Sequence, residues 1–560
     1  MSDMKTSTHK TIIAAALLFA AGAVSAAGAS GEKCNIKGTV TLDGVPAVGV
    51  TVCDGRIFAV TDKDGHYSMQ SDKLDSTVFV ITPSGTVALS EDGLQPGFWK
   101  PLCGDVGKVE RADFALKSEK QERYGVVFIP DLHLGRVPGR DEERKYREIA
   151  LPKIGEWVSE MSAEGPVYAM ALGDMTQDKF WYSCSFNGID GYNLMKDAGF
   201  PAPIYAISGN HDNDGAVYTG AENTDRDAAW MYRRTWGPDK YSVNIGGDHW
   251  IFMDDTYYIN DIGGDLKAQV AHNYECRFTL RQLQWLEEDL GRVDKDTQIF
   301  LCTHIPFYNS ILKKLKISRE QMDHIYALLQ PFSKDAVCFA AHIHRTDFLV
   351  RDEYPRLKVY NLPAASGGMW VSFPGQPFFA EDGADAGAYC ASFGGGVPWS
   401  GWYNSYTRGR KCCRVYDANT MAAYCAADPH IPSLKYAYTN FDAYEDPALK
   451  DCVIVNYWTW QRGHKVEILE DGVSLKVEKR DLHDPLMMLT YEGSRVDPNG
   501  KKMKKREKGY MGALGKGFHM FIAKASGPDT PVTVRISDEN GNLIHEETVI
   551  RPKSFSLEMD

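Results

Sequence analysis

Seven polar side chains fall into five short motifs whose residue types are those of a metal site. The motifs follow one another between residues 131 and 344 as Asp131-Leu132-His133, Gly173-Asp174, Gly209-Asn210-His211-Asp212, His304 and His342-Ile343-His344. Apart from His211 and Asp212, they offer two aspartates, one asparagine and four histidines, and no thiolate. This mixture of oxygen and nitrogen donors suits Mn, Fe or Zn, and disfavours a cysteine-bound structural zinc or a calcium cage.

A pair of such ions would carry out the chemistry of phosphate esters. A carboxylate has two oxygens and can bridge two ions about 3.5–4 Å apart, which hold a hydroxide between them and grip a phosphoryl oxygen. Two divalent ions bring four positive charges and two aspartates remove two, so the site keeps about +2. That local charge would attract a phosphate even though the formal net charge of the chain is −13.

Apolar strands must position these motifs, because each motif follows an apolar run. The predicted strands with their motifs are 124–133, 165–174, 202–212, 296–306 and 336–344. Helical periodicity marks the intervening segments 142–161, 279–293 and 318–330. Apolar strands alternating with helices predict a layered α/β domain. Ligands bind beyond the carboxyl ends of such strands, so five strand ends would converge on one rim.

The remainder of the 560 residues divides by composition. Residues 34–118 alternate β-branched and turn residues and predict an N-terminal β-sandwich module. The catalytic domain is expected over 124–385, and a connecting segment rich in aromatic residues and glycine over 386–450. Residues 451–560 alternate in the manner of strands and predict a C-terminal β-rich domain.

The N-terminus reads as a signal peptide over residues 1–26. Lys5, His9 and Lys10 precede an apolar run that ends near the small residues Val24-Ser25-Ala26. A helix that spans a bilayer needs about 20 apolar residues. This run is shorter, so it favours a cleaved signal peptide over the alternative of a membrane anchor. We therefore expect an exported protein of the periplasm or cell surface, with no transmembrane helix in the mature chain. The acidic balance argues against binding to duplex nucleic acid or to anionic membranes.

The twelve cysteines could form disulfides in an exported protein, but their connectivity cannot be read from the sequence. Cys302 and Cys338 lie in apolar runs and are expected to be buried thiols. Cys412 and Cys413 are adjacent and could take separate partners.

The five motifs resemble the signature of the calcineurin-like metallophosphoesterases: D-x-H, G-D, G-N-H-D or G-N-H-E, a lone histidine, and G-H-x-H. The resemblance implies a central layered β-sandwich flanked by helices, and two divalent transition-metal ions. It implies hydrolysis of a phosphate mono- or diester by a metal-bridging hydroxide, with His211 protonating the leaving oxygen. One ion would take Asp131, His133, Asp174 and His344, and the other would take Asp174, Asn210, His304 and His342.

Two positions depart from related patterns. Ala341 replaces the usual glycine of the last motif, which matters only if that position needs a positive φ. Gln177 stands where purple acid phosphatases carry a tyrosine, so a ferric–tyrosinate centre is disfavoured. The order of the β modules resembles that of large secreted bacterial members of the superfamily, which does not fix a substrate.

Other residues near the motifs have two interpretations each. Asp212 could orient His211 or cap its loop, and Arg136 and Arg345 could clamp phosphate or lie solvated at the surface. Aromatic side chains could line a substrate cleft or pack in the core; they are Phe307, Tyr308, Trp399 and Trp402.

The substrate is expected to be a small-molecule phosphate ester or one linked to a glycan or lipid. The alternatives are a surface protein that binds a glycan or partner on a vestigial scaffold, and a hydrolase of another ester.

Overall fold

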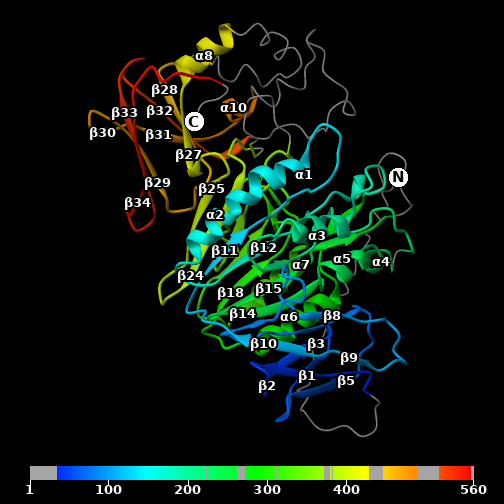
Figure 1. The fold of residues 1–560 in the computed structure, drawn as a ribbon. Coiled ribbons are helices and arrows are strands. Elements are labelled where there is room, and N and C mark those ends of the chain that lie inside the picture. The colour runs from blue at the N-terminus through cyan, green and yellow to red at the C-terminus, as the bar shows by residue number, and fades with distance from the viewer. Residues whose placement is uncertain are drawn as a thin grey trace, which may run out of the picture.

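The fold is that of a computed structural model, which describes residues 34–220, 223–260, 272–310, 313–370, 379–380, 382–427, 446–488 and 516–556. The predicted signal peptide lies outside these residues. Within them, no helix combines the length and the apolar character that crossing a bilayer requires. Figure 1 shows three units along the molecule, from the blue N-terminal module through the cyan and green centre to the yellow and red C-terminal domain.

The central unit is built on two six-stranded sheets. The first has the order β13-β12-β11-β24-β25-β26 and the second β14-β15-β18-β21-β23-β22. The first sheet contains β11 (Arg123–Phe128), β12 (Val167–Ala171), β13 (Ile204–Ala206), β24 (Gly387–Gly394), β25 (Ser400–Ser405) and β26 (Gly409–Arg410). The second contains β14 (Lys240–Ile245), β15 (Asp248–Met253), β18 (Gln298–Cys302), β21 (Ala336–Ala340), β22 (Asp347–Val350) and β23 (Leu357–Asn361).

Both faces of these sheets are buried, which explains the continuous apolar runs. Along β11, Val126 and Phe128 join the core between the sheets, whereas Val127, and Ile129 just after the strand, join the core beneath the helices. Side chains alternate across a strand, so one apolar run can serve two cores. The core between the sheets is aromatic: the Phe128 and Phe339 ring centroids lie 4.4 Å apart. The predicted β-sandwich flanked by helices is confirmed.

The helices begin where the sequence supplies caps. Thr279 accepts the backbone N–H of Gln282 and completes a capping box that starts one helix, and Ser318 caps another. The helices of this unit are α1 (Glu142–Lys145), α2 (Leu151–Met161), α3 (Gly188–Asp197), α4 (Thr224–Ala228), α5 (Trp230–Thr235), α6 (Leu280–Gly291) and α7 (Arg319–Leu329). Two small hairpins accompany them: β16 (Thr256–Tyr258) with β17 (Tyr274–Cys276), and β19 (Tyr308–Asn309) with β20 (Lys314–Leu315).

The N-terminal module consists of two small sheets. Its strands are β1 (Ile36–Leu42), β2 (Val45–Pro46), β3 (Thr51–Cys53), β4 (Phe58–Val60), β5 (His66–Met69), β6 (Thr77–Val80), β7 (Thr86–Ala88), β8 (Trp99–Pro101), β9 (Glu110–Arg111) and β10 (Phe114–Ser118). It packs closely on the central unit, because the rings of Phe98 and Tyr241 lie 4.7 Å apart.

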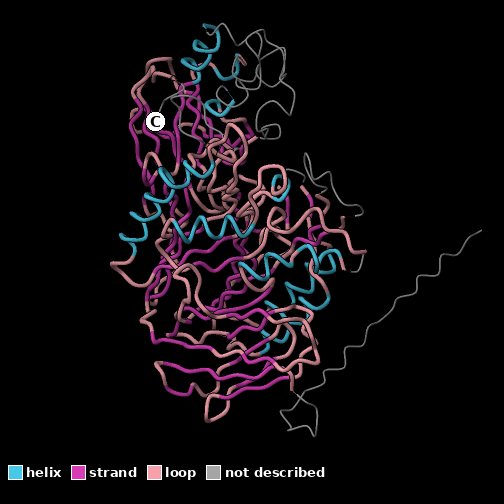
Figure 2. The backbone as a smooth tube through the Cα atoms, turned by 45° about the vertical axis from the view of Figure 1, so that its right-hand side comes forward, coloured by secondary structure: helices cyan, strands magenta, loops and turns pink. Residues whose placement is uncertain are grey.

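The C-terminal domain also has two sheets, with the orders β27-β28-β32-β31 and β30-β29-β33-β34. Figure 2 shows these strands at one end of the molecule. The elements are β27 (Cys413–Asp417), α8 (Ala418–Ala427), β28 (Cys452–Tyr457), β29 (Lys465–Glu470), β30 (Val473–Ser474), β31 (Val477–Leu482), α10 (Pro485–Met487), β32 (Gly517–Lys524), β33 (Val532–Ser537) and β34 (Leu543–Val549).

The interval 386–450 differs from the expected connecting segment. Its first part forms β24, which pairs with β11 over six residues, and β25, which pairs with β24. Its next part forms β27, which pairs with β28 of the C-terminal domain. The Gly- and aromatic-rich composition concealed these strands, because the aromatic side chains pack into the cores on either side of them. Residues 428–445 lie outside the described residues.

None of the twelve cysteines, all of which lie within the described ranges, forms a disulfide. Cys302 and Cys338 are buried, as predicted.

Candidate metal centre

The seven predicted ligands converge where five strands end. β11, β12 and β13 run parallel in the first sheet, and β18 and β21 run parallel in the second. Their carboxyl ends therefore open toward one edge of the sandwich. The side chains that follow these ends are Asp131 and His133, Asp174, Asn210, His304, and His342 and His344.

The backbone at this edge is held in the left-handed region. Five of the seven residues have positive φ: Asp131 (50°), His133 (46°), Asp174 (55°), His342 (71°) and His344 (52°). Such conformations cost about 1–3 kcal/mol each in non-glycine residues and persist at functional sites. Because Ala341 does not have positive φ, its replacement of the usual glycine costs nothing there.

Four of the side chains form the first group: Asp131, His133, Asp174 and His344. One ligand atom from each lies within 4.8 Å of the others. The Nε2 atoms of His133 and His344 face each other at 3.0 Å, and Nε2 of His344 lies 3.5 Å from Oδ1 of Asp131. Two facing imidazole nitrogens need a proton or a cation between them.

The second group joins Asp174 to His304, His342 and Asn210. The Oδ1 atom of Asn210 lies 3.0 Å from Nε2 of His304 and 2.6 Å from Nδ1 of His342. The other ring nitrogen of His304 contacts the backbone carbonyl oxygen of Leu172 at 2.8 Å. That contact places a proton on Nδ1 and turns Nε2 toward the group.

Asp174 lies between the two groups. Its Oδ2 atom is 3.8 Å from Nε2 of His133 in the first group and 3.4 Å from Nε2 of His304 in the second. Its Oδ1 atom accepts the backbone N–H of His211 at 2.7 Å. A carboxylate placed in this way is suited to bridge two ions.

Burial and charge set the protonation of the groups. Enclosure away from water holds the pKa of His133 and of His342 well below the usual range. Burial opposes the ionisation of Asp174, but the neighbouring histidines, chiefly His304, outweigh it and hold the pKa of that carboxyl well below its usual range. Burial alone would lower the pKa of His304, but the Asp174 carboxylate raises it to about 10. Metal binding would therefore displace a proton from His304.

His211 lies beside the two groups and is held by Asp178. The Nδ1 atom of His211 lies 2.7 Å from Oδ1 of Asp178, and the His211 side chain is 14% exposed. A carboxylate on Nδ1 fixes the tautomer and leaves Nε2 for proton transfer. The residue that orients His211 is therefore Asp178, and not Asp212 as one of the two interpretations expected.

Asp212 instead caps the loops that carry the ligands. Its Oδ1 atom accepts the backbone N–H groups of Met175 and Thr176, and its Oδ2 atom accepts that of Gly209. The chain adjacency of Asp212 and His211 was misleading, because the Asp212 side chain turns toward the backbone.

His272, which belongs to none of the five motifs, lies beside Asp178 and His211. Its Nδ1 atom lies 2.8 Å from Oδ2 of Asp178, and its ring stacks on that of His211 with centroids 4.5 Å apart. Its Nε2 atom lies 3.1 Å from the Asn210 amide nitrogen. His272 therefore turns the Asn210 oxygen toward His304 and His342. The position of Asp178, four residues after Asp174 of the second motif, was a usable signal, but His272 offered none.

The remaining candidates beside the motifs are Gln177, Arg136 and Arg345. Gln177 is buried and donates to the His133 carbonyl oxygen at 2.8 Å, while it accepts from Arg140 at 2.6 Å. It therefore supports the His133 loop and leaves no place there for a tyrosinate. Arg136 is exposed and lies 3.4 Å from Glu143, whereas Arg345 is buried.

The four aromatic candidates do not converge on this edge. Phe307 is buried in the core, and Trp399 stacks on Phe393 within the sandwich. Tyr308 lies beneath the Arg351 guanidinium, 4.0 Å from its ring centroid. Trp402 borders a separate hollow next to the C-terminal domain.

The residues present fit divalent transition metals. The donors are carboxylate, imidazole and amide oxygen, as such ions require. The facing nitrogens of His133 and His344 point to a common ligand.

Two known protein families match the part of the chain that contains these residues and the module before it. Residues 124–346 match the family described as calcineurin-like phosphoesterase. Residues 34–119 match the family described as the N terminal of calcineurin-like phosphoesterase. No curated protein matches the chain.

Solved structures resemble about half of the chain at low identity. A dimetal phosphatase from Danio rerio is 11% identical over 51% of this chain and 96% of its own, with a TM-score of 0.33. A 5'-nucleotidase from Candida albicans is 12% identical over 50% of this chain and 51% of its own, with a TM-score of 0.30. A calcineurin-like phosphoesterase from Bacillus subtilis is 10% identical over 51% and 91%, with a TM-score of 0.26.

Proposed function

We propose that this chain is a dinuclear-metal hydrolase of phosphate mono- or diesters. Residues 124–346 form its calcineurin-like phosphoesterase domain, and residues 34–119 form the N-terminal companion of that domain. One observation carries the proposal. The Asp174 carboxylate lies between two groups of ligand atoms, each gathered within 4.8 Å.

The seven residues would hold the two ions as two sets that share Asp174. When bound, the ions supply an activated water and the positive charge that meets the phosphoryl oxygens. Asp131 and Asp174 offset part of that charge, while the histidines and Asn210 remain neutral as ligands. The site therefore keeps the positive charge that selects a phosphate.

His211 would donate the proton to the leaving oxygen. Its Nδ1 faces the Asp178 carboxylate at 2.7 Å, which fixes the ring and leaves Nε2 as the nitrogen for proton transfer. The partial exposure of His211, in contrast to the buried His133 and His304, lets it reach a substrate.

The substrate in this proposal is a small-molecule phosphate ester or one linked to a glycan or lipid. Export to the periplasm or cell surface remains a proposal based on the pattern of residues 1–26. The rival interpretation, a binding protein on a vestigial scaffold, is disfavoured because a vestigial site would have lost ligands, whereas all seven are present and convergent.

The test is Mn²⁺-dependent hydrolysis of nitrophenyl phosphate and bis-nitrophenyl phosphate by the full chain. We expect His211→Ala to lower kcat about 10²–10⁴-fold while metal content stays near that of the wild type. Asp174→Asn should lose metal and activity together, because it removes the shared carboxylate.

A matched control is His249→Asn, which alters a buried histidine outside the site, bonded to Asp289 at 2.8 Å. It should keep both metal and activity in the folded fraction. No turnover of either ester by the metal-loaded, folded wild type would refute the proposal, and equal metal loss in the His211 and Asp174 variants would refute the separate roles. A screen of phosphorylated metabolites, nucleotides and phosphoglycans would then identify the substrate.

A further inference from the structure

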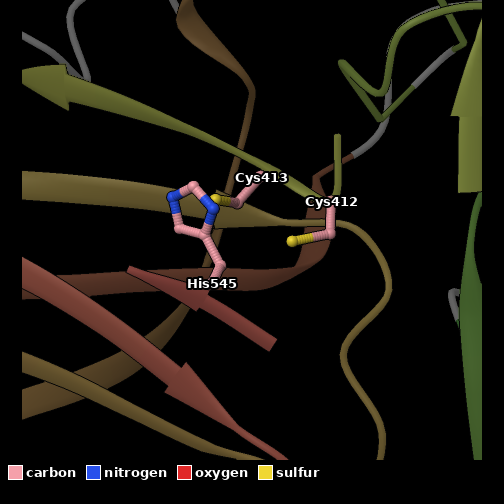
Figure 3. Close-up of side chains that lie close together, drawn as sticks. All are labelled: Cys412, Cys413 and His545. Atoms are coloured by element: carbon pink, nitrogen blue, oxygen red, sulfur yellow. The ribbon is translucent and has the colours of Figure 1, made fainter. Parts of the chain in front are cut away.

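Two adjacent cysteines and a distant histidine meet in the C-terminal domain. Cys412 immediately precedes β27, Cys413 is the first residue of β27, and His545 lies in β34. One ligand atom from each lies within 4.8 Å of the others. Figure 3 shows the three side chains pointing toward one another, with one imidazole nitrogen beside the sulfurs.

Consecutive side chains rarely share a direction, so their convergence is informative. Neighbouring residues inside a strand point to opposite faces. Cys412 lies just outside β27 and escapes that alternation, so its thiol can receive a hydrogen bond from Cys413. The backbone therefore presents two sulfurs to one point, opposite a histidine from another sheet.

A carboxylate lies on the far side of the histidine. Nε2 of His545 lies 3.5 Å from Oε2 of Glu547. A carboxylate behind a histidine fixes the ring and raises its basicity, which is the usual arrangement behind metal-bound histidines. The nitrogen turned toward the sulfurs in Figure 3 is the one that would bind.

The two thiols differ in exposure. Cys412 is partly exposed and Cys413 is buried. Thiolates are the species that bind soft metal ions.

Two of the three groups, Cys412 and His545, line a hollow of about 920 Å³ between β25 of the central unit and the C-terminal domain. Its lining includes Trp402, Arg410 and Lys553. The ligand atoms of a tetrahedral zinc site lie about 3.5–3.8 Å apart, given Zn–S and Zn–N bonds near 2.3 and 2.0 Å. A small approach of the three atoms would reach that geometry, and the hollow leaves room for a fourth ligand.

We propose that Cys412, Cys413 and His545 form a further metal site that binds one thiophilic divalent ion such as Zn²⁺, with its fourth position open toward the hollow. The ion would displace the thiol protons and take two sulfur ligands and one nitrogen ligand. β27 and β34 are edge strands of the two different C-terminal sheets, so the ion would join these sheets at their edges.

The test uses the full chain and the Co²⁺ ion as a probe. A thiolate–cobalt charge-transfer band can arise here but not from the seven-residue centre, which contains no cysteine. We expect one Co²⁺ equivalent to give this band and Zn²⁺ to abolish it. Cys412→Ser and His545→Asn should remove the band, and Glu547→Gln should weaken binding about 10–100-fold.

The matched control is Cys184→Ser, which changes another partly exposed cysteine and should keep the band. Because substitution can unfold a domain, Zn²⁺ protection of Cys412 from alkylation is also measured in the unmutated protein, and we expect modification at least about tenfold slower. Ester hydrolysis should stay unchanged in Cys412→Ser, so failure of this site and failure of the proposed function are distinguishable. A wild type without the band, a variant that retains it, or a Cys412–Cys413 disulfide in the purified protein would overturn the proposal.

Discussion

At the scale of residues, Asp178 connects proton transfer to metal binding. Its two carboxylate oxygens contact Nδ1 of His211 and Nδ1 of His272, and the Asp178 side chain is fully buried. His272 in turn fixes the amide of Asn210. One aspartate therefore orients the proposed acid and, through a second histidine, a proposed ligand.

We predict that Asp178→Asn lowers kcat about 10–100-fold, because an amide can accept from only one of the two histidines. The pH profile of kcat should also change, since the hydrogen-bond partner of His211 Nδ1 changes from a carboxylate to an amide. Measurement of kcat against pH, with metal content determined in parallel, checks this expectation.

Asp212→Asn is the matched comparison, because Asp212 binds the loop backbone and not His211. It should lower thermal stability and leave the pH profile of kcat unshifted. A profile shifted by Asp212→Asn and untouched by Asp178→Asn would reverse these assignments.

At the scale of elements, short helices support the ligand loops through buried polar contacts. Asp225 in the first turn of α4 accepts the backbone N–H of Tyr258 in β16 at 2.8 Å. Tyr258 in turn donates its hydroxyl to the carbonyl oxygen of Asn210. The α4–β16 contact therefore supports the loop that carries one proposed ligand.

This contact has a predicted pH dependence. Burial raises the pKa of Asp225 from 3.8 to about 6. The folded protein then binds more protons than the unfolded chain between about pH 4 and pH 6, so stability falls as pH rises through that window. Asp225→Asn stays neutral and keeps an acceptor for Tyr258.

The free energy of unfolding of Asp225→Asn should therefore exceed that of the wild type by an amount that grows from pH 4 to pH 6 and stays constant above. We expect this difference to reach about 1–2 kcal/mol, since Asp225 is partly exposed to solvent. Unfolding free energies at several pH values check this. Asp227→Asn, a more exposed aspartate of the same helix, is the control; an advantage of Asp225→Asn that is independent of pH would contradict the burial argument.

At the scale of the whole molecule, partly or fully buried ion pairs attach the outer units to the centre. On the N-terminal side, Arg281 of α6 donates to Asp75 at 2.8 Å and to both oxygens of Asp72 at 2.8 and 2.9 Å. On the C-terminal side, the buried Arg414 of β27 donates to Asp385 and to the carbonyl oxygen of Gly383. Both units are therefore fixed to the central sandwich by specific contacts as well as by apolar packing.

We predict that Arg281→Met destabilises the protein by about 2–3 kcal/mol, because it leaves Asp72 and Asp75 without their shared partner in a partly buried interface. Hydrolysis per folded molecule should persist, since Arg281 donates to Asp72 and Asp75 and not to any of the seven ligands. Thermal unfolding and limited proteolysis near residues 119–122 measure the effect. Arg147→Met, which removes an exposed contact with Glu143 at 3.5 Å, should change stability by about 0.5 kcal/mol or less.

The expected family domain is confirmed by the matches to residues 34–119 and 124–346. The secreted bacterial type, export and the substrate class stay predictions. The sandwich was predictable because apolar runs that end in polar motifs are a local property of the sequence. The strands within 386–450 were not, because glycine and aromatic residues take their place in a sheet only when neighbouring strands supply partners.

The sequence by itself determined which side chains gather at the site, since residue type and position after a strand specify both the donor and the edge it reaches. Only the tertiary structure decided how those side chains are oriented. Asp178 and His272 are 94 residues apart, and His272 and Asn210 are 62 apart. Such contacts depend on the packing of whole loops, and that packing leaves no periodicity or motif along the chain.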